Sequence, residues 1–147
     1  MTAKTTFSED EWKLVAEGPV TAGMMLMTAE SGGTFRETFA LARAYADARQ
    51  QHGESELLDE IVSARPEFDR DRYSSPEQLR TEGLQRLDDA VALLRAKATP
   101  EELADYQEFV IALATKVATA HKEDGQELSP REQSALDEIR ARLEAAR

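Results

Sequence analysis

Apolar residues recur along most of the chain at intervals of three and four, which places them on one face of a helix. Four such series stand out: Phe35, Phe39, Ala42 and Ala46, with Tyr45 at the margin; Leu84, Leu87, Val91, Leu94 and Ala98; Tyr106, Phe109, Val110, Leu113, Val117 and Ala120; and Leu136, Ile139 and Leu143. No stretch shows the alternation of a half-buried strand. The pattern predicts an all-α fold.

Five capping boxes mark where helices begin. In a capping box a Ser or Thr hydroxyl accepts a hydrogen bond from the third following backbone N–H, while a Glu or Gln at that position bonds back. The five are Ser8–Glu11, Thr34–Glu37, Ser75–Gln78, Thr99–Glu102 and Ser129–Glu132. With the apolar series they predict a compact bundle of about seven helices, near residues 9–17, 20–30, 35–51, 55–64, 76–98, 100–122 and 130–145.

Two of these helices raise the question of binding surfaces. The helix near 20–30 is apolar on nearly all sides, which is typical of a central, enclosed helix. Its methionines, Met24, Met25 and Met27, suit either an adaptable binding surface or a core. We favour the core, because the helix has no polar face to expose. The heptad-like series from 84 to 98 suits either a homodimer seam or packing within the chain, and we favour the second.

Length and composition predict a single domain over residues 1–147, with residues 1–7 as a flexible N-terminal tail. The chain has no Cys, which excludes thiolate metal sites and thiol catalysis. The longest apolar run, residues 19–29, is about half of what a membrane span needs. We see no export signal in residues 1–10 and therefore expect a cytoplasmic protein.

The charge of the chain restricts the class of partner. There are 29 acidic and 18 basic residues, and the formal net charge is −11. An acidic field opposes binding to phosphate backbones and to anionic lipid. We therefore expect neither nucleic acid nor membrane as a partner. A cation or a basic protein surface agrees better with this charge.

The least regular segment covers residues 65–74, where charges of both signs alternate around Phe68 and Tyr73. It is longer than most helix connections, and long connections often carry function. One interpretation is a contact loop for a partner protein. The other, which we favour slightly, is that the two aromatic side chains seal the core while the charges stay solvated.

Two parts of the sequence resemble each other. Residues 34–41 align with residues 129–136, and each segment follows an apolar helix and a glycine-bearing loop. The chain can therefore contain two pseudo-repeated units of helix, Gly loop and capped helix. The alternative is chance, because capping boxes look alike wherever they occur.

The second of these units resembles a known family. The stretch from Val117 through Asp124-Gly125 to Glu132, followed by Leu136 and Ile139, is similar to the TerB-like family associated with tellurite resistance. The resemblance implies an all-helical fold with two pseudo-repeated halves and an association with stress responses. Divalent-metal binding, which has been suspected for that family, is implied as well.

The acidic loop of this unit is the best candidate for a metal site. Its candidate ligands are Glu123, Asp124, Glu127 and Glu132. Several carboxylates beside a tight turn suit a hard cation such as Ca²⁺, which takes six to eight oxygen ligands. The loop is not an EF-hand, because alignment on Gly125 puts Ala120 and Arg131 where carboxylates are required. The alternative, which we favour, is a solvated turn in which Glu132 caps the next helix.

No catalytic constellation is evident in the sequence. His52 and His121 lie at predicted helix ends, and neither has the spacing of helical metal ligands. We therefore expect no enzyme and no resident cofactor. Our first hypothesis is a protein-interaction or stress-associated scaffold of TerB-like type. The alternative is a module that responds to a divalent cation through the acidic loop at 123–132.

Overall fold

The computed structural model describes residues 6–29, 35–50, 56–63, 75–119 and 130–144. Six α-helices and no strands occur in these residues. They are α1 (Glu9–Ala29), α2 (Phe35–Gln50), α3 (Glu56–Ser63), α4 (Pro76–Lys97), α5 (Pro100–Thr119) and α6 (Pro130–Glu144). The predicted all-α class is confirmed for this part of the chain. From α2 onward the predicted helices match the observed ones to within three residues at each end.

The number of helices was predicted wrongly at the N-terminal end. The expected helices near 9–17 and 20–30 are one continuous helix, α1, with Pro19 inside it. A proline has no N–H and leaves the carbonyl four residues earlier without a helical partner. For Pro19 that carbonyl belongs to Val15, and the hydroxyl of Tyr106 in α5 donates to it at 2.8 Å. This bond from a neighbouring helix explains why α1 continues through the proline.

Gly18 makes room for that hydroxyl. A Cβ atom at Gly18 would lie 2.0 Å from the Tyr106 hydroxyl oxygen, far inside van der Waals contact. Gly83 in α4 has a similar role, since a Cβ there would lie 3.0 Å from Sδ of Met25. Both glycines therefore allow a close approach of α1 to its neighbours.

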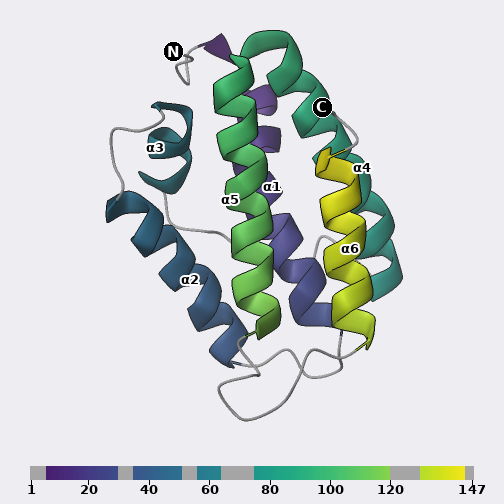
Figure 1. The fold of residues 1–147 in the computed structure, drawn as a ribbon. Helices are drawn as coiled ribbons and strands as arrows, with labels where there is room; N and C mark the ends of the chain where they lie inside the picture. The colour runs from purple at the N-terminus through teal and green to yellow at the C-terminus, as the bar shows by residue number, and fades with distance from the viewer. Residues whose placement is uncertain (1–5, 30–34, 51–55, 64–74, 120–129, 145–147) are drawn as a thin grey trace.

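Helix α1 packs against α4, α5 and α6, while α2 and α3 lie against one side of α5 (Figure 1). Four ion pairs show the relative directions of the helices: Glu11–Lys97, Glu17–Arg86, Arg80–Glu138 and Asp88–Arg142. The first two pairs join α1 to α4. Residue numbers rise along α1 while those of their partners fall along α4, so these helices are antiparallel. The last two join α4 to α6 in the same sense, so this pair is parallel.

The core is formed mainly by the apolar series predicted from the sequence. Buried side chains include Leu84, Leu87, Val91, Leu94, Tyr106, Val110, Leu113, Val117, Leu136, Ile139 and Leu143. Met24 and Met25 are also buried, which confirms the core interpretation for these two methionines. The series from Leu84 to Leu94 packs within the chain, so those side chains are not available for a dimer seam. None of the helices in the described residues has the length and apolar content needed to cross a bilayer.

Over its described side chains, residues 42–50, α2 buries a face that differs from the one expected. Ala42 is exposed, whereas Ala44 and Tyr45 are buried, so Tyr45 belongs to the buried face and not to its margin. The side chains of Phe35 and Phe39 lie outside the described part of the chain. The Tyr45 ring meets Phe109 of α5 edge-on, with centroids 5.6 Å apart. Burying the large aromatic surface of Tyr45 gains more than burying an alanine methyl group, which favours this orientation over one that buries Ala42.

Three of the predicted capping boxes lie within the described residues. Ser8 with Glu11, and Thr99 with Glu102, form both reciprocal hydrogen bonds. Ser75 accepts from the backbone N–H of Gln78, as expected of an N-cap. The signals at 34 and 129 lie outside the described residues. Local hydrogen bonding therefore sets the starts of α1, α4 and α5.

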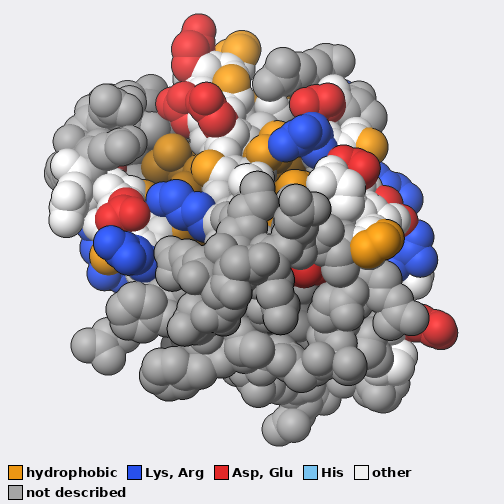
Figure 2. All heavy atoms as spheres, turned by 60° about the horizontal axis from the view of Figure 1, so that its bottom comes forward, with side chains coloured by type: hydrophobic (Ala, Val, Ile, Leu, Met, Phe, Trp, Pro, Cys, Tyr) orange, Lys and Arg blue, Asp and Glu red, His pale blue; other side chains and the backbone are white. Residues whose placement is uncertain are grey.

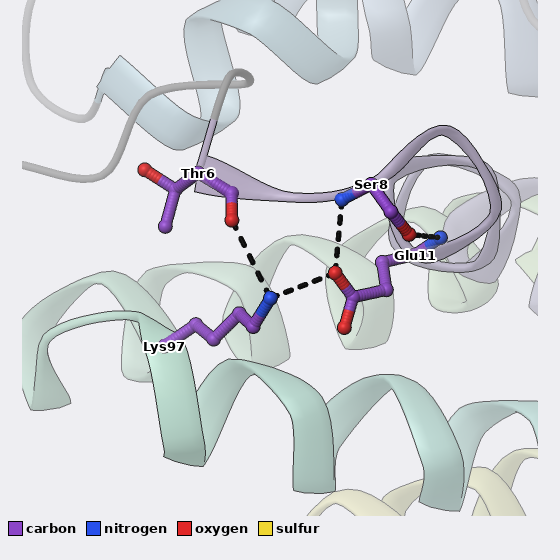
Figure 3. Close-up of polar contacts among 4 residues, drawn as sticks. All are labelled: Thr6, Ser8, Glu11 and Lys97. Atoms are coloured by element: carbon purple, nitrogen blue, oxygen red, sulfur yellow. Dashed lines mark hydrogen bonds and ion pairs between the residues drawn. The ribbon is translucent and has the colours of Figure 1, made fainter.

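The chain just before α1 is held by Lys97 at the end of α4 (Figure 3). The Lys97 ammonium lies 2.7 Å from Oε1 of Glu11 and donates to the Thr6 carbonyl at 3.4 Å. Phe7, which is 7% exposed, packs against Trp12. We expected a flexible tail over residues 1–7, but Thr6 and Phe7 are both held in this way. Residues 1–5 lie outside the described part of the chain.

Candidate functional site

Most of the predicted metal site lies outside the described residues. Glu123, Asp124 and Glu127 belong to the range 120–129, of which the structure gives no description. Glu132 is described: it lies in the first turn of α6 and is 2% exposed. In the described ranges no group of three or more His, Asp or Glu side chains is arranged to hold a metal ion. The metal site stays a prediction.

Other segments discussed in the sequence analysis also lie outside the described residues. They are the segment 65–74, the glycine loops of the two pseudo-repeats, and both histidines. Neither the contact loop nor the internal repeat is tested by the structure. The candidate site must therefore come from the helices themselves.

A groove lies between α2, α3 and α5, with a volume of about 310 Å³. Its lining comes from all three helices: Ala44, Asp47 and Ala48; Leu58 and Asp59; and Asp105, Glu108, Phe109, Ala112, Leu113 and Lys116. On the left of Figure 2 hydrophobic side chains are visible, with acidic side chains above them and both basic and acidic side chains below. The volume is at the lower end of the range for small-ligand pockets.

Short side chains create the groove. Ala44 and Ala48 are one helical turn apart on α2, and Ala112 lies opposite on α5. An alanine at each position leaves unfilled the space that a longer side chain would occupy. Phe109 forms part of the apolar surface, and its ring is braced from behind by Tyr45. The apolar part of the groove is thus held by the core and is present before any ligand binds.

Charged side chains surround this apolar surface. Asp47, Asp59, Asp105 and Glu108 contribute four carboxylates, and Lys116 contributes one ammonium group. The Lys116 ammonium lies 3.3 Å from Oδ2 of Asp47, so this pair connects α5 with α2. The arrangement offers a shallow apolar surface inside an acidic rim.

The attachment of α2 and α3 positions two walls of the groove. The Arg49 guanidinium on α2 donates to the Val62 carbonyl near the end of α3 at 2.6 Å. This bond to a carbonyl in the last turn satisfies a backbone acceptor that the short helix leaves open. Leu57 and Ile61 of α3 are buried beneath. Asp59 and Leu58 are thereby kept at the edge of the groove.

No family model, curated protein or solved structure matches the chain. The resemblance of residues 117–139 to the TerB-like family therefore stays a hypothesis.

Sequence reasoning missed the groove, although a signal for it exists. Asp105, Glu108, Ala112 and Lys116 recur at three- and four-residue intervals beside the core series of α5. In the sequence alone these carboxylates look like an ordinary solvated helix face. The combination of acid and alanine at helical spacing becomes informative only once α2 and α3 are known to lie opposite.

Proposed function

We propose that this chain is a non-enzymatic helical protein-interaction domain that holds a short segment of a partner protein in the groove between α2, α3 and α5. The observation that carries the proposal is the groove itself, where an apolar surface braced by Tyr45 lies inside an acidic rim. Protein interfaces combine a desolvated apolar centre with a polar rim in the same way.

The size of the groove favours a few anchoring side chains over a whole folded partner. About 310 Å³ accommodates two or three side chains of a peptide. Binding energy in protein interfaces is concentrated in such anchors, while the surrounding contacts exclude water. The groove is therefore suited to a linear segment with one or two dominant residues.

The partial resemblance to the TerB-like family agrees with this role. From it we expect a scaffold that serves in a stress-associated assembly, with the second helix–Gly loop–helix unit covering residues 117–139. A scaffold acts through contacts with other proteins, and the groove would provide such a contact. The TerB-like fold and the stress association are part of the proposal.

The proposal is tested by selecting binders from a displayed library of random peptides against the folded domain. Ala112 is exposed and lines the groove, whereas Ala104 is exposed on the same helix and does not line it. The substitution Ala112→Trp fills the groove with a large ring, and Ala104→Trp is the matched control. Thermal melts of both variants establish that the fold is intact.

We expect the selected peptides to lose binding to the Ala112→Trp variant and to retain it with Ala104→Trp. In amide chemical-shift maps the changes should concentrate on α2, α3 and α5. The proposal is wrong if no peptide is enriched, if Ala112→Trp leaves binding intact, or if the changes concentrate on α4 and α6.

A further inference from the structure

The electrostatic character of the groove selects the charge of its occupant. The described lining residues include four carboxylates and one ammonium group. A concave surface lined by one sign of charge raises the local concentration of the opposite charge. The net charge of −11 acts in the same direction. The occupant that suits this groove carries positive charge.

Lys116 already offers one cation to the rim. Its ammonium pairs with Asp47 across the groove at 3.3 Å, and both side chains are 50% exposed. An ion pair so accessible to water holds its two members weakly and is screened further by salt. A cation supplied by a ligand can therefore replace Lys116 at Asp47.

The apolar part of the groove selects what accompanies this cation. Phe109 is partly exposed, and its ring orientation is fixed by the edge-on contact with Tyr45. Leu58 lies on the α3 side. An aromatic face beside carboxylates suits a guanidinium group, which binds carboxylates in a bidentate manner and stacks on aromatic rings. Lysine has a compact ammonium that does neither as well.

We infer that the partner segment presents an arginine next to an apolar side chain of about the size of leucine. The arginine replaces Lys116 at Asp47, and the apolar side chain lies against Phe109 and Leu58. This inference rests on the proposed function, since it names the partner chemistry for the same groove. Lys116 then acts as an internal competitor that the ligand must displace.

Three synthetic peptides of about 15 residues, long enough to form a helix on binding, test the inference. The first carries arginine and leucine on one helical face. The second carries citrulline in place of arginine, which keeps the shape but removes the charge. The third carries alanine in place of leucine. Binding of each is measured by fluorescence anisotropy at low and at physiological ionic strength.

Three variants of the domain separate the contribution of the rim from that of net charge. Asp47→Asn with Glu108→Gln removes two exposed groove carboxylates. Asp10→Asn with Glu144→Gln removes two exposed carboxylates that do not line the groove and is the matched control. Lys116→Met removes the internal competitor while keeping an unbranched side chain of nearly the same length.

We expect the arginine–leucine peptide to bind best and to lose affinity as salt is added. The groove variant should weaken this binding about threefold to tenfold, the size of effect that two exposed ion pairs give. The control variant should change it less than twofold, and Lys116→Met should strengthen it about twofold or more.

Equal binding of the arginine and citrulline peptides would overturn the inference, as would an equal loss in the groove variant and the control. Weaker binding to Lys116→Met would refute the competitor role. These failures are distinct from failure of the proposed function. Library peptides that bind in the groove without a cationic residue would leave the proposed function in place and remove the inference alone.

Discussion

The contact between Tyr106 and the proline-containing part of α1 yields the sharpest prediction. Pro19 deprives the Val15 carbonyl of its helical donor, and the Tyr106 hydroxyl replaces that donor at 2.8 Å. Val15 and Tyr106 are both fully buried, so water cannot take the place of the hydroxyl. Burial also raises the pKa of Tyr106 above its ordinary value, which keeps the hydroxyl protonated as a donor. Removal of this group should therefore have a measurable cost.

The substitution Tyr106→Phe removes the donor and leaves the ring in place. A buried carbonyl without a partner costs about 1–3 kcal/mol. Gly18→Ala acts on the same contact, because the new Cβ would lie 2.0 Å from the hydroxyl oxygen. Although alanine is favoured over glycine in a helix by about 1 kcal/mol, overpacking costs about 1–3 kcal/mol, and the displaced hydroxyl also loses its bond. We expect a net loss of about 2 kcal/mol for either single variant.

The double variant should be much better than the sum of the two. Without the hydroxyl, the nearest atom to the new Cβ at Gly18 is Cζ of Tyr106 at 3.3 Å, which small adjustments accommodate. In the Tyr106→Phe background, Gly18→Ala should therefore be neutral or stabilising by up to about 1 kcal/mol. The expected coupling energy between the two substitutions is about 2 kcal/mol.

Urea unfolding followed by far-UV circular dichroism gives the four free energies of this double-mutant cycle. Tyr45→Phe is the control, because none of the described residues accepts a hydrogen bond from the buried Tyr45 hydroxyl. Its removal should be neutral or slightly stabilising. Additive effects of Gly18→Ala and Tyr106→Phe, within about 0.5 kcal/mol, would refute the argument. So would a cost for Tyr45→Phe equal to that of Tyr106→Phe.

Three further predictions concern single groups. The hydrogen bond from Lys97, and then the one from the Ser8 backbone, lower the pKa of Glu11 in the folded protein. Ionised Glu11 therefore stabilises the fold above its unfolded pKa of about 4.3. This stabilisation disappears as the pH falls through the lower pKa of the folded state. In urea titrations, Glu11→Gln should destabilise the protein at pH 7 and not at pH about 2. The Gln107 side-chain amide donates to the Leu143 carbonyl in α6 at 2.7 Å. Gln107→Ala leaves this buried carbonyl without its donor and should lower Tm by several degrees. Saturating Ca²⁺ should leave Tm unchanged; a rise that Asp124→Asn with Glu132→Gln abolishes would establish the metal site instead.

Local signals predicted the helices well because their causes are local. The hydroxyl of Thr99 and the carboxylate of Glu102 bond within one turn, so the sequence alone identifies where α5 begins. The apolar series of α5 likewise points to the face that is buried. The break expected between residues 17 and 20 failed for the opposite reason. Whether Pro19 ends a helix depends on Tyr106, a residue 87 positions later, which the local pattern does not contain.

The candidate site was harder to predict than the fold because its parts come from three helices. Asp47, Asp59 and Asp105 are each an ordinary surface carboxylate in the sequence. Only the packing of α2 and α3 against α5 brings them to one rim. The rotation of α2 about its axis was also wrong at the sequence level, and this rotation decides that Ala44 and Ala48 face α5. The sequence therefore pointed to the acidic loop at 123–132, where carboxylates are close together along the chain.

The way in which α2 and α3 are attached connects the fold to the proposed function. The body formed by α1, α4, α5 and α6 is joined by buried apolar series and by four ion pairs. Among its described side chains, α2 packs on α5 through the buried Ala44 and Tyr45, and the half-exposed pair of Asp47 with Lys116 lies at the edge of this contact. Breaking that pair costs little, so the Asp47 and Lys116 side chains can separate while Tyr45 keeps the apolar surface at Phe109 in place. The proposed site therefore combines an apolar surface that is fixed by the core with a charged rim whose side chains can rearrange, and such a site can accept segments that differ in the placement of their cation.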